Sequence, residues 1–223
     1  MNETLTAKPT RLVVMDVDST LIRQEVIEQI AVHAGTMELV AEITERAMRG
    51  ELDFAQSLIE RVATLKGVTL EELAQVRSQI EFSTGAREFI AACQERGWEV
   101  ALVSGGFREI VAGLAAEVGI TRFRANSLEV HNGVLTGRTI GTIVDRAYKE
   151  LSLREFAREL DLELSATIAL GDGANDLDMI RAAGVGIAFN AKPIVQEQAP
   201  YSVTGSMLGA LSIIDEHDAR ASL

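Results

Sequence analysis

Residues 12–21 of the chain read LVVMDVDSTL, an apolar run followed by two aspartates two positions apart. The run predicts a buried strand over residues 11–15. Asp16 and Asp18 then fall where that strand ends, which is where open α/β sheets bind their ligands. The same residue types also occur in turns that only terminate a strand. The functional alternative is that this turn presents a nucleophile, a proton donor and a metal ligand together.

The remainder of the chain alternates between strand and helix patterns. Short apolar runs predict strands at 99–103, 166–170 and 185–189, and the residues HNG at 131–133 predict a hairpin. Helix periodicity is seen at 85–97, 109–118, 150–160 and 176–183, whereas the polar residues 216–223 predict a frayed end. Strands that alternate with helices favour an α/β fold with a mainly parallel sheet covered by helices.

A long helical block separates the first two strands. Apolar stripes at 25–34, 37–49, 54–65 and 69–80 predict four helices, the last opened by a capping box at Thr69 and Glu72. This block is too long for a simple crossover. We therefore expect residues 21–83 to form a helical cap inserted into a core made of residues 1–20 and 84–223.

Composition excludes several classes of protein. The formal net charge of the 223 residues is −12, which argues against a basic nucleic-acid-binding surface. The single cysteine, Cys93, rules out an internal disulfide framework. Neither a signal peptide nor a membrane-length apolar run is visible, so we expect a cytoplasmic protein with no membrane partner. The oligomeric state stays open, with a homodimer as one candidate.

Two more predicted strands end in polar, turn-forming residues. The residues SGG at 104–106 follow one strand, and GDGAND at 171–176 follows another. If these strands are neighbours in a parallel sheet, Asp16 and Asp172 can hold Mg²⁺ together with a backbone carbonyl. Glycines beside a helix N-terminus let backbone N–H groups approach an anion. This combination predicts phosphoryl transfer, where catalysis consists mainly of positioning and charge neutralisation.

These motifs, with a lone downstream Lys149, resemble the four motifs of the haloacid dehalogenase superfamily of phosphatases. Stretches at 47–50, 53–62 and 188–193 are further similar to the branch of that superfamily that hydrolyses O-phosphoserine. The resemblance runs from about residue 11 to residue 193. It implies a Rossmann-like core with an inserted helical cap and a phosphoric monoester hydrolase. The implied reaction is Mg²⁺-dependent hydrolysis of O-phospho-L-serine to L-serine and phosphate, the last step of L-serine biosynthesis.

The resemblance also implies roles for the motif residues. Asp16 is the expected nucleophile and forms an aspartyl-phosphate. Asp18 protonates the leaving oxygen and then activates the hydrolytic water. Asp16, the Asp18 carbonyl and Asp172 bind Mg²⁺. Asp176 supports the metal site from behind these ligands or through a water molecule.

Four other core residues are expected to contact or order the phosphate. The resemblance implies that Ser104, Gly105 and Lys149 hold phosphate oxygens and that Asn175 helps to order the site.

The cap contains the candidates for substrate recognition. Phe54, Leu58 and Arg61 share one helix face by their spacing. Arg61 there is either a snorkelling side chain at the rim of the core or a fork for a carboxylate. Glu25 near a helix start can simply complement the helix dipole. The resemblance implies instead that Glu25 meets the substrate ammonium, with Met48 and Phe54 forming walls of the pocket.

Three other functions remain compatible with these motifs. An aspartyl-phosphate could pass its phosphoryl group to homoserine, which would make the protein a phosphotransferase. A receiver-type signalling module also uses an aspartate at a strand end, but the cap and the paired Asp16 and Asp18 argue against it. A related small-molecule phosphatase would differ mainly at Glu25 and Arg61.

Overall fold

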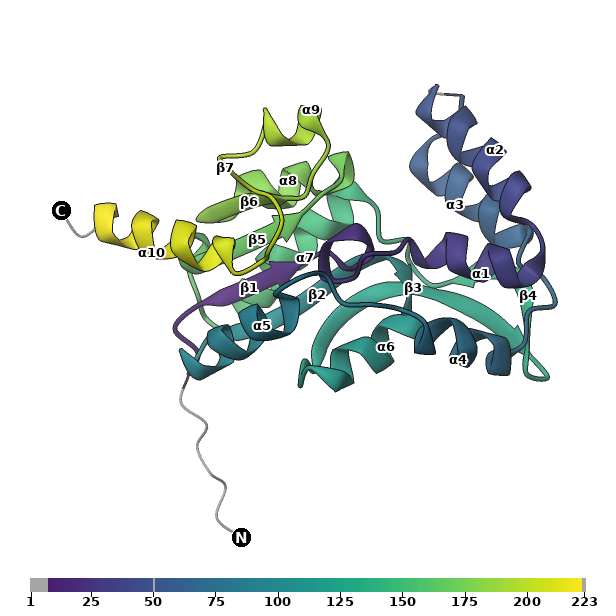
Figure 1. Cartoon of the computed structure of the whole chain (residues 1–223), viewed down its shortest axis with the longest axis horizontal. Coiled ribbons are helices and arrows are strands. Elements are labelled where there is room, and N and C mark those ends of the chain that lie inside the picture. Colours follow the sequence, from purple (N-terminus) through teal and green to yellow (C-terminus); the bar gives the residue numbers. More distant parts are fainter. Residues whose placement is uncertain (1–7, 50, 222–223) are drawn as a thin grey trace, which may run out of the picture.

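The computed structural model describes residues 8–49 and 51–221. Within them, seven strands form one sheet in the order β4-β3-β2-β1-β5-β6-β7, with β1 (Leu12–Met15) at its centre (Figure 1). The other strands are β2 (Glu99–Phe107), β3 (Arg122–His131), β4 (Val134–Ile140), β5 (Thr167–Gly171), β6 (Val185–Phe189) and β7 (Tyr201–Val203). Every pairing is parallel except that of β3 with β4. The prediction of a mainly parallel α/β sheet is confirmed.

Both faces of the sheet are buried. Val13 and Met15 on β1 face one apolar core, and Leu12 and Val14 face the other. The first core contains residues of α5 (Ala86–Glu95), α6 (Arg108–Glu117) and α10 (Gly209–Ala221), and the second those of α7 (Arg146–Glu159) and α8 (Leu177–Ala182). A strand buried on both faces needs a continuous apolar run rather than alternation. This need explains the unbroken apolar sequence of β1.

The helical block lies beside the core and carries four helices among the described residues (Figure 1). They are α1 (Val26–Ala34), α2 (Met37–Met48), α3 (Phe54–Ala63) and α4 (Leu70–Ser78). The predicted capping box at the start of α4 is present, with the Thr69 N–H donating to Glu72 Oε2 at 2.7 Å. The chain enters and leaves this block side by side, because Ile22 pairs antiparallel with Phe82. This geometry is compatible with the expected cap boundaries at residues 21 and 83.

The predicted hairpin is confirmed, and β4 also contacts the helical block. Leu135 exchanges backbone hydrogen bonds with Gly67 at 2.9 Å and with Val68 at 2.8 Å. The hairpin therefore extends the sheet under the helices. None of the helices in the described ranges has the length and hydropathy that a bilayer crossing requires.

The prediction of a frayed C-terminal end is wrong for residues 216–221; residues 222–223 lie outside the described part. The helix α10 runs as far as Ala221. Its polar side chains bind the core: Asp218 pairs with Arg11 at 2.6 Å, and His217 shares a hydrogen bond with the Tyr201 hydroxyl at 3.0 Å. The polar residues face partners in the core, which the local sequence does not reveal. A short helix α9 (Pro193–Gln196) precedes β7.

Candidate active site

The parallel register places three strand ends at one edge of the sheet. Met15 is level with Leu102 of β2 and with Leu170 of β5. Asp16 follows Met15, and its N–H donates to the Leu170 carbonyl at 3.0 Å. The convergence predicted from the sequence is thus confirmed, and Asp172 lies next to the end of β1.

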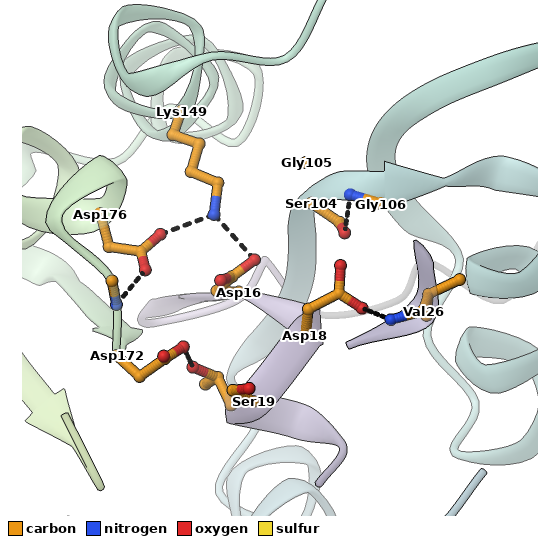
Figure 2. Close-up of polar contacts among 12 residues, drawn as sticks. Asp16, Asp18, Ser19, Val26, Ser104, Gly105, Gly106, Lys149, Asp172 and Asp176 are labelled. Atoms are coloured by element: carbon orange, nitrogen blue, oxygen red, sulfur yellow. Dashed lines mark hydrogen bonds and ion pairs between the residues drawn. The ribbon is translucent and has the colours of Figure 1, made fainter. Parts of the chain in front are cut away.

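Asp16 directly follows β1, and the tight turn after it, Val17–Leu21, carries Asp18 into the site. Ser19 at its centre adopts a left-handed backbone conformation, with a φ of 54°. The Asp18 carboxylate accepts a hydrogen bond from the Val26 N–H at 3.2 Å. The first cap helix therefore holds the Asp18 side chain in place (Figure 2).

Lys149 lies at the centre of the acidic cluster. Its fully buried ammonium group is 2.7 Å from Asp16 Oδ1 and 2.7 Å from Asp176 Oδ1 (Figure 2). The helix that carries it, α7, begins at Arg146 rather than near residue 150 as predicted. The Asp145 side chain caps it by accepting from the Tyr148 N–H at 2.8 Å. The earlier start places Lys149 in the first turns of the helix, at the sheet edge.

Three carboxylates surround this single lysine. Asp16, Asp172 and Asp176 each offer an oxygen within 4.8 Å of the others. Thr20 donates to one oxygen of Asp172 at 2.9 Å. Both Asp176 oxygens already have donors in the protein, from Lys149 and from the Gly173 N–H at 3.0 Å. Asp16 and Asp172 keep free oxygens, so a divalent cation with oxygen ligands fits the cluster, with Asp176 as a support.

Burial and mutual repulsion change the proton affinity of these groups. Burial raises the pKa of Asp16, helped by Asp176 and offset only in part by Lys149. Burial and then Asp176 raise the pKa of Asp172 to about 6. Burial opposes the charge of Lys149, but its two carboxylate partners outweigh that effect and raise its pKa. A bound cation would reduce the repulsion among these three carboxylates.

Asp18 differs from the cluster because its carboxylate faces Glu25. Burial and then the Glu25 charge raise the pKa of Asp18 to about 7. A carboxyl group with this pKa is able to give up a proton and take one back near neutral pH, as a general acid and base must.

The turn at the end of β2 interrupts the sheet. Ser104 pairs with Ala125 and Phe107 with Asn126, so Gly105 and Gly106 bulge out of the ladder. The Gly106 N–H donates to Ser104 Oγ at 2.8 Å.

A side chain at Gly106 would also collide with Asp18, in the turn that follows β1. Its Cβ would lie 2.6 Å from Asp18 Oδ2, so any other residue at this position would displace the Asp18 carboxylate. The expected phosphate ligand Ser104 is fully buried behind the turn and is not among the residues that line the cavity.

A cavity of about 490 Å³ lies between the sheet edge and the helical block. Nine of the predicted site residues line it: Asp16, Asp18, Glu25, Phe54, Arg61, Gly105, Lys149, Asp172 and Asn175. Ser104 and Asp176 lie behind this lining, and the Met48 side chain falls outside the described part of the structure.

The cap side of the cavity carries one acidic and one basic group. Arg61 donates to the Ser57 carbonyl at 3.2 Å and makes no ion pair with any described residue. Burial lowers the pKa of Arg61, while Glu25 acts in the opposite direction. Glu25 accepts from the Ser19 hydroxyl at 2.6 Å. The Phe54 ring reaches the core, 3.3 Å from where a Gly105 side chain would begin.

Three residues of the site were not identified from the sequence. Thr20, which holds Asp172, lies within the first motif and could have been found as a polar residue following it. Lys192 lines the cavity from the stretch 188–193 that carried part of the resemblance. Asn126 lies in the middle of β3, where no local pattern distinguishes it.

The chain belongs to the haloacid dehalogenase-like hydrolase family, whose model matches residues 13–181. This membership excludes the receiver-type module. Two of the relatives are phosphoserine phosphatases. A phosphoserine phosphatase from Streptococcus thermophilus is 54% identical over 206 residues, which cover 92% of this chain and 96% of that protein. A phosphoserine phosphatase from Streptomyces coelicolor is 53% identical over 193 residues; these cover 86% of this chain and 47% of the relative, so the chain spans about half of it.

The solved structures agree. A phospho-aspartyl intermediate analogue of phosphoserine phosphatase superposes with a TM-score of 0.86 and 39% identity, covering 92% of this chain and 99% of that chain.

Proposed function

We propose that this protein is a Mg²⁺-dependent phosphoserine phosphatase that hydrolyses O-phospho-L-serine to L-serine and phosphate. The observation that carries this proposal is the composition of the cavity between the sheet edge and the helical block. Asp16 and Asp18 lie at its core side, and the unpaired Arg61 and Glu25 lie at its cap side. A phosphorylated amino acid has the matching groups, a phosphate at one end and an ammonium and a carboxylate at the other.

The core residues perform the reaction in two steps. An Asp16 carboxylate oxygen attacks the phosphorus, and the bond from phosphorus to the serine oxygen breaks. Asp18 gives its proton to that leaving oxygen. Asp18 then accepts a proton from water, whose oxygen attacks the phosphorus of the aspartyl-phosphate. Phosphate is released, and the Asp16 carboxylate is restored.

The remaining core residues hold the phosphate. An ammonium group has three donors, and two of those of Lys149 serve Asp16 and Asp176. The third is free for a phosphate oxygen. Ser104 supports the phosphate from behind the cavity lining, because its Oγ accepts from the Gly106 N–H and holds the turn that lines the cavity.

Asp16, the Asp18 carbonyl and Asp172 would hold Mg²⁺, with Asp176 behind them. When bound, the ion neutralises charge on the phosphate oxygens.

The cap residues select the amino acid. Arg61 offers a planar fork that suits the substrate carboxylate, and Glu25 offers a counter-charge for its ammonium group. We assign Met48 and Phe54 to the walls of this pocket. We place the enzyme in the cytoplasm, because free phosphoserine is an intermediate of amino-acid biosynthesis and this reaction completes L-serine synthesis. A homodimer is its candidate assembly.

The deciding experiment measures phosphate release from L-phosphoserine with Mg²⁺, beside a panel of other phosphomonoesters. D16N is the matched variant, because it keeps the shape of the nucleophile and removes its charge. We expect strong preference for phosphoserine in the wild type and no turnover by D16N. Phosphohomoserine formed when homoserine is added would redefine the enzyme as a transferase, and an active D16N would remove Asp16 as the nucleophile.

A further inference from the structure

Asn126 occupies the gap that the bulge leaves in the sheet. The two extra residues of β2, Gly105 and Gly106, have no partner on β3 at the step from Ala125 to Asn126. A buried backbone carbonyl without a partner is costly. The Asn126 side chain removes this cost, because its Nδ2 donates to the Gly105 carbonyl at 2.8 Å.

The other end of the same amide binds a different segment. Asn126 Oδ1 accepts from the Val144 N–H at 2.8 Å. Only one orientation of the amide satisfies both contacts, because the nitrogen must face a carbonyl and the oxygen an N–H. Asn126 is only 2% exposed, so water does not compete for these bonds. Val144 directly precedes Asp145, the residue that caps α7.

The two bonds therefore link the turn 104–106 to the segment before α7, the two parts of the site to which the proposed function assigns the phosphate. The Gly105–Gly106 peptide is planar, so its C=O and N–H groups point in opposite directions. Asn126 fixes the C=O group, and Ser104 Oγ accepts the N–H group. The orientation of the Ser104 hydroxyl thus depends on Asn126. On the other side, Val144 leads into the helix that carries Lys149.

We propose that Asn126 is a positioning residue that sets the phosphate-binding turn 104–106 against the start of α7. This inference rests on the proposed function, because it assigns the turn to phosphate. Asn126 does not touch the substrate; it acts through Gly105, Ser104 and Val144. Asn126→Asp is the sharpest probe. It keeps the shape and the acceptor for Val144 but places an oxygen against the Gly105 carbonyl.

The control is Thr167→Val at the opposite end of β5 from Asp172. Thr167 is also fully buried, and its hydroxyl donates to the Leu164 carbonyl at 2.7 Å and accepts from the Gly184 N–H at 3.4 Å. Asn126→Asp therefore loses one buried hydrogen bond to the backbone, and Thr167→Val loses two, so the control is at least as disruptive locally. Only Asn126→Asp disturbs the phosphate-binding turn.

The test measures the affinity of each Mg²⁺-loaded protein for inorganic phosphate by calorimetry, well below the melting temperature, together with kcat and KM for L-phosphoserine. We expect N126D to bind phosphate roughly tenfold more weakly and to lose kcat/KM in proportion. T167V should match the wild type in both and lose only thermal stability.

Unchanged phosphate affinity in N126D, with an active wild type, overturns the positioning role alone. A wild type that releases no phosphate from phosphoserine overturns the proposed function instead. If N126D does not fold, N126S keeps one hydroxyl for one of the two backbone groups and is judged by the same affinity. A loss beyond that of T167V supports the role, and wild-type affinity refutes it.

Discussion

Replacing Lys149 by methionine tests whether one buried cation holds the acidic cluster together. The lysine ammonium lies 2.7 Å from carboxylate oxygens of both Asp16 and Asp176, and all three side chains are almost fully buried. Methionine fills a similar volume but leaves these carboxylates without their cation. Removing one partner of a buried ion pair costs about 3–5 kcal/mol. For a chain of this length, that loss corresponds to a fall in Tm of roughly 6–20 °C.

The pH dependence of this loss has a definite sign. Burial raises the pKa of Asp16, so its proton-bound form is favoured in the folded state, and the folded protein gains stability as the pH falls. In K149M the cost of the unpaired carboxylates is therefore largest at neutral and alkaline pH. It shrinks toward pH 4, where the carboxyl groups bind protons and lose their charge.

The assay is thermal unfolding followed by circular dichroism at pH 5 and pH 8, with a chelator present so that no bound metal replaces the lysine. K8M is the matched control, since Lys8 also lies 2.7 Å from a carboxylate, that of Asp161, but with side chains 55% and 94% exposed. An exposed pair contributes about 0–1 kcal/mol. Equal destabilisation of K149M and K8M at pH 8, or a K149M effect that does not change with pH, would refute the reasoning.

Three further outcomes follow from the site. Arg61→Met should raise KM for L-phosphoserine by roughly tenfold or more while leaving hydrolysis of p-nitrophenyl phosphate unchanged. Arg46→Met is the control, because Arg46 pairs with Glu60 and does not line the cavity, and it should alter neither; equal losses on both substrates in Arg61→Met would exclude carboxylate recognition. Gly106→Ala should lower kcat at least about tenfold with little change in Tm, because its Cβ meets side-chain ends, Asp18 Oδ2 at 2.6 Å and Ser104 Oγ at 3.0 Å, and no backbone. Steady-state kinetics beside a melting curve check this, and an unchanged kcat would contradict it. The metal-free protein should become less stable as the pH rises from 4 to 7, because burial raises the pKa of Asp18 to about 7 and that of Asp172 to about 6. D18N in chelator should show a shallower dependence of stability on pH, and an identical slope would show that Asp18 does not contribute.

The sequence predicted the features that depend on local pattern. The unbroken apolar run of β1 follows from burial on both faces, and the polar residues that follow it mark the sheet edge. The capping box at Thr69 uses side chains within three residues of the backbone they bind, and the hairpin turn uses two adjacent residues, Asn132 and Gly133, that accept a positive φ. Such signals are contained in the chain itself, so every strand except β7, the four cap helices and nine residues of the cavity lining could be predicted.

Features that depend on distant partners could not be predicted. Asp176 pairs with a lysine 27 residues away, and Asn126 binds backbone atoms 21 and 18 residues away. An asparagine in the middle of a strand pattern gives no sign of the bulge it completes. The start of α7 was missed because Asp145 is one of many aspartates that could cap a helix. Only the position of the bulge and the sheet order distinguish these residues from ordinary surface polar groups.

The division of the cavity explains how an acidic chain receives an anionic substrate. The formal net charge is −12, so attraction must come from a few placed cations. Lys149 is neutralised by two carboxylates in the free protein, so on its own it gives the core side little net positive charge. Under the proposed function, Arg61 is the cap's cation for the substrate carboxylate, and Glu25 restricts binding to molecules that also carry an ammonium group; both residues line the cavity. In this proposal the core uses a metal ion to accept phosphate, and the cap uses the full amino acid to satisfy both of its charges. Changes to the cap should consequently alter which phosphate ester is selected while leaving the chemistry at Asp16 intact.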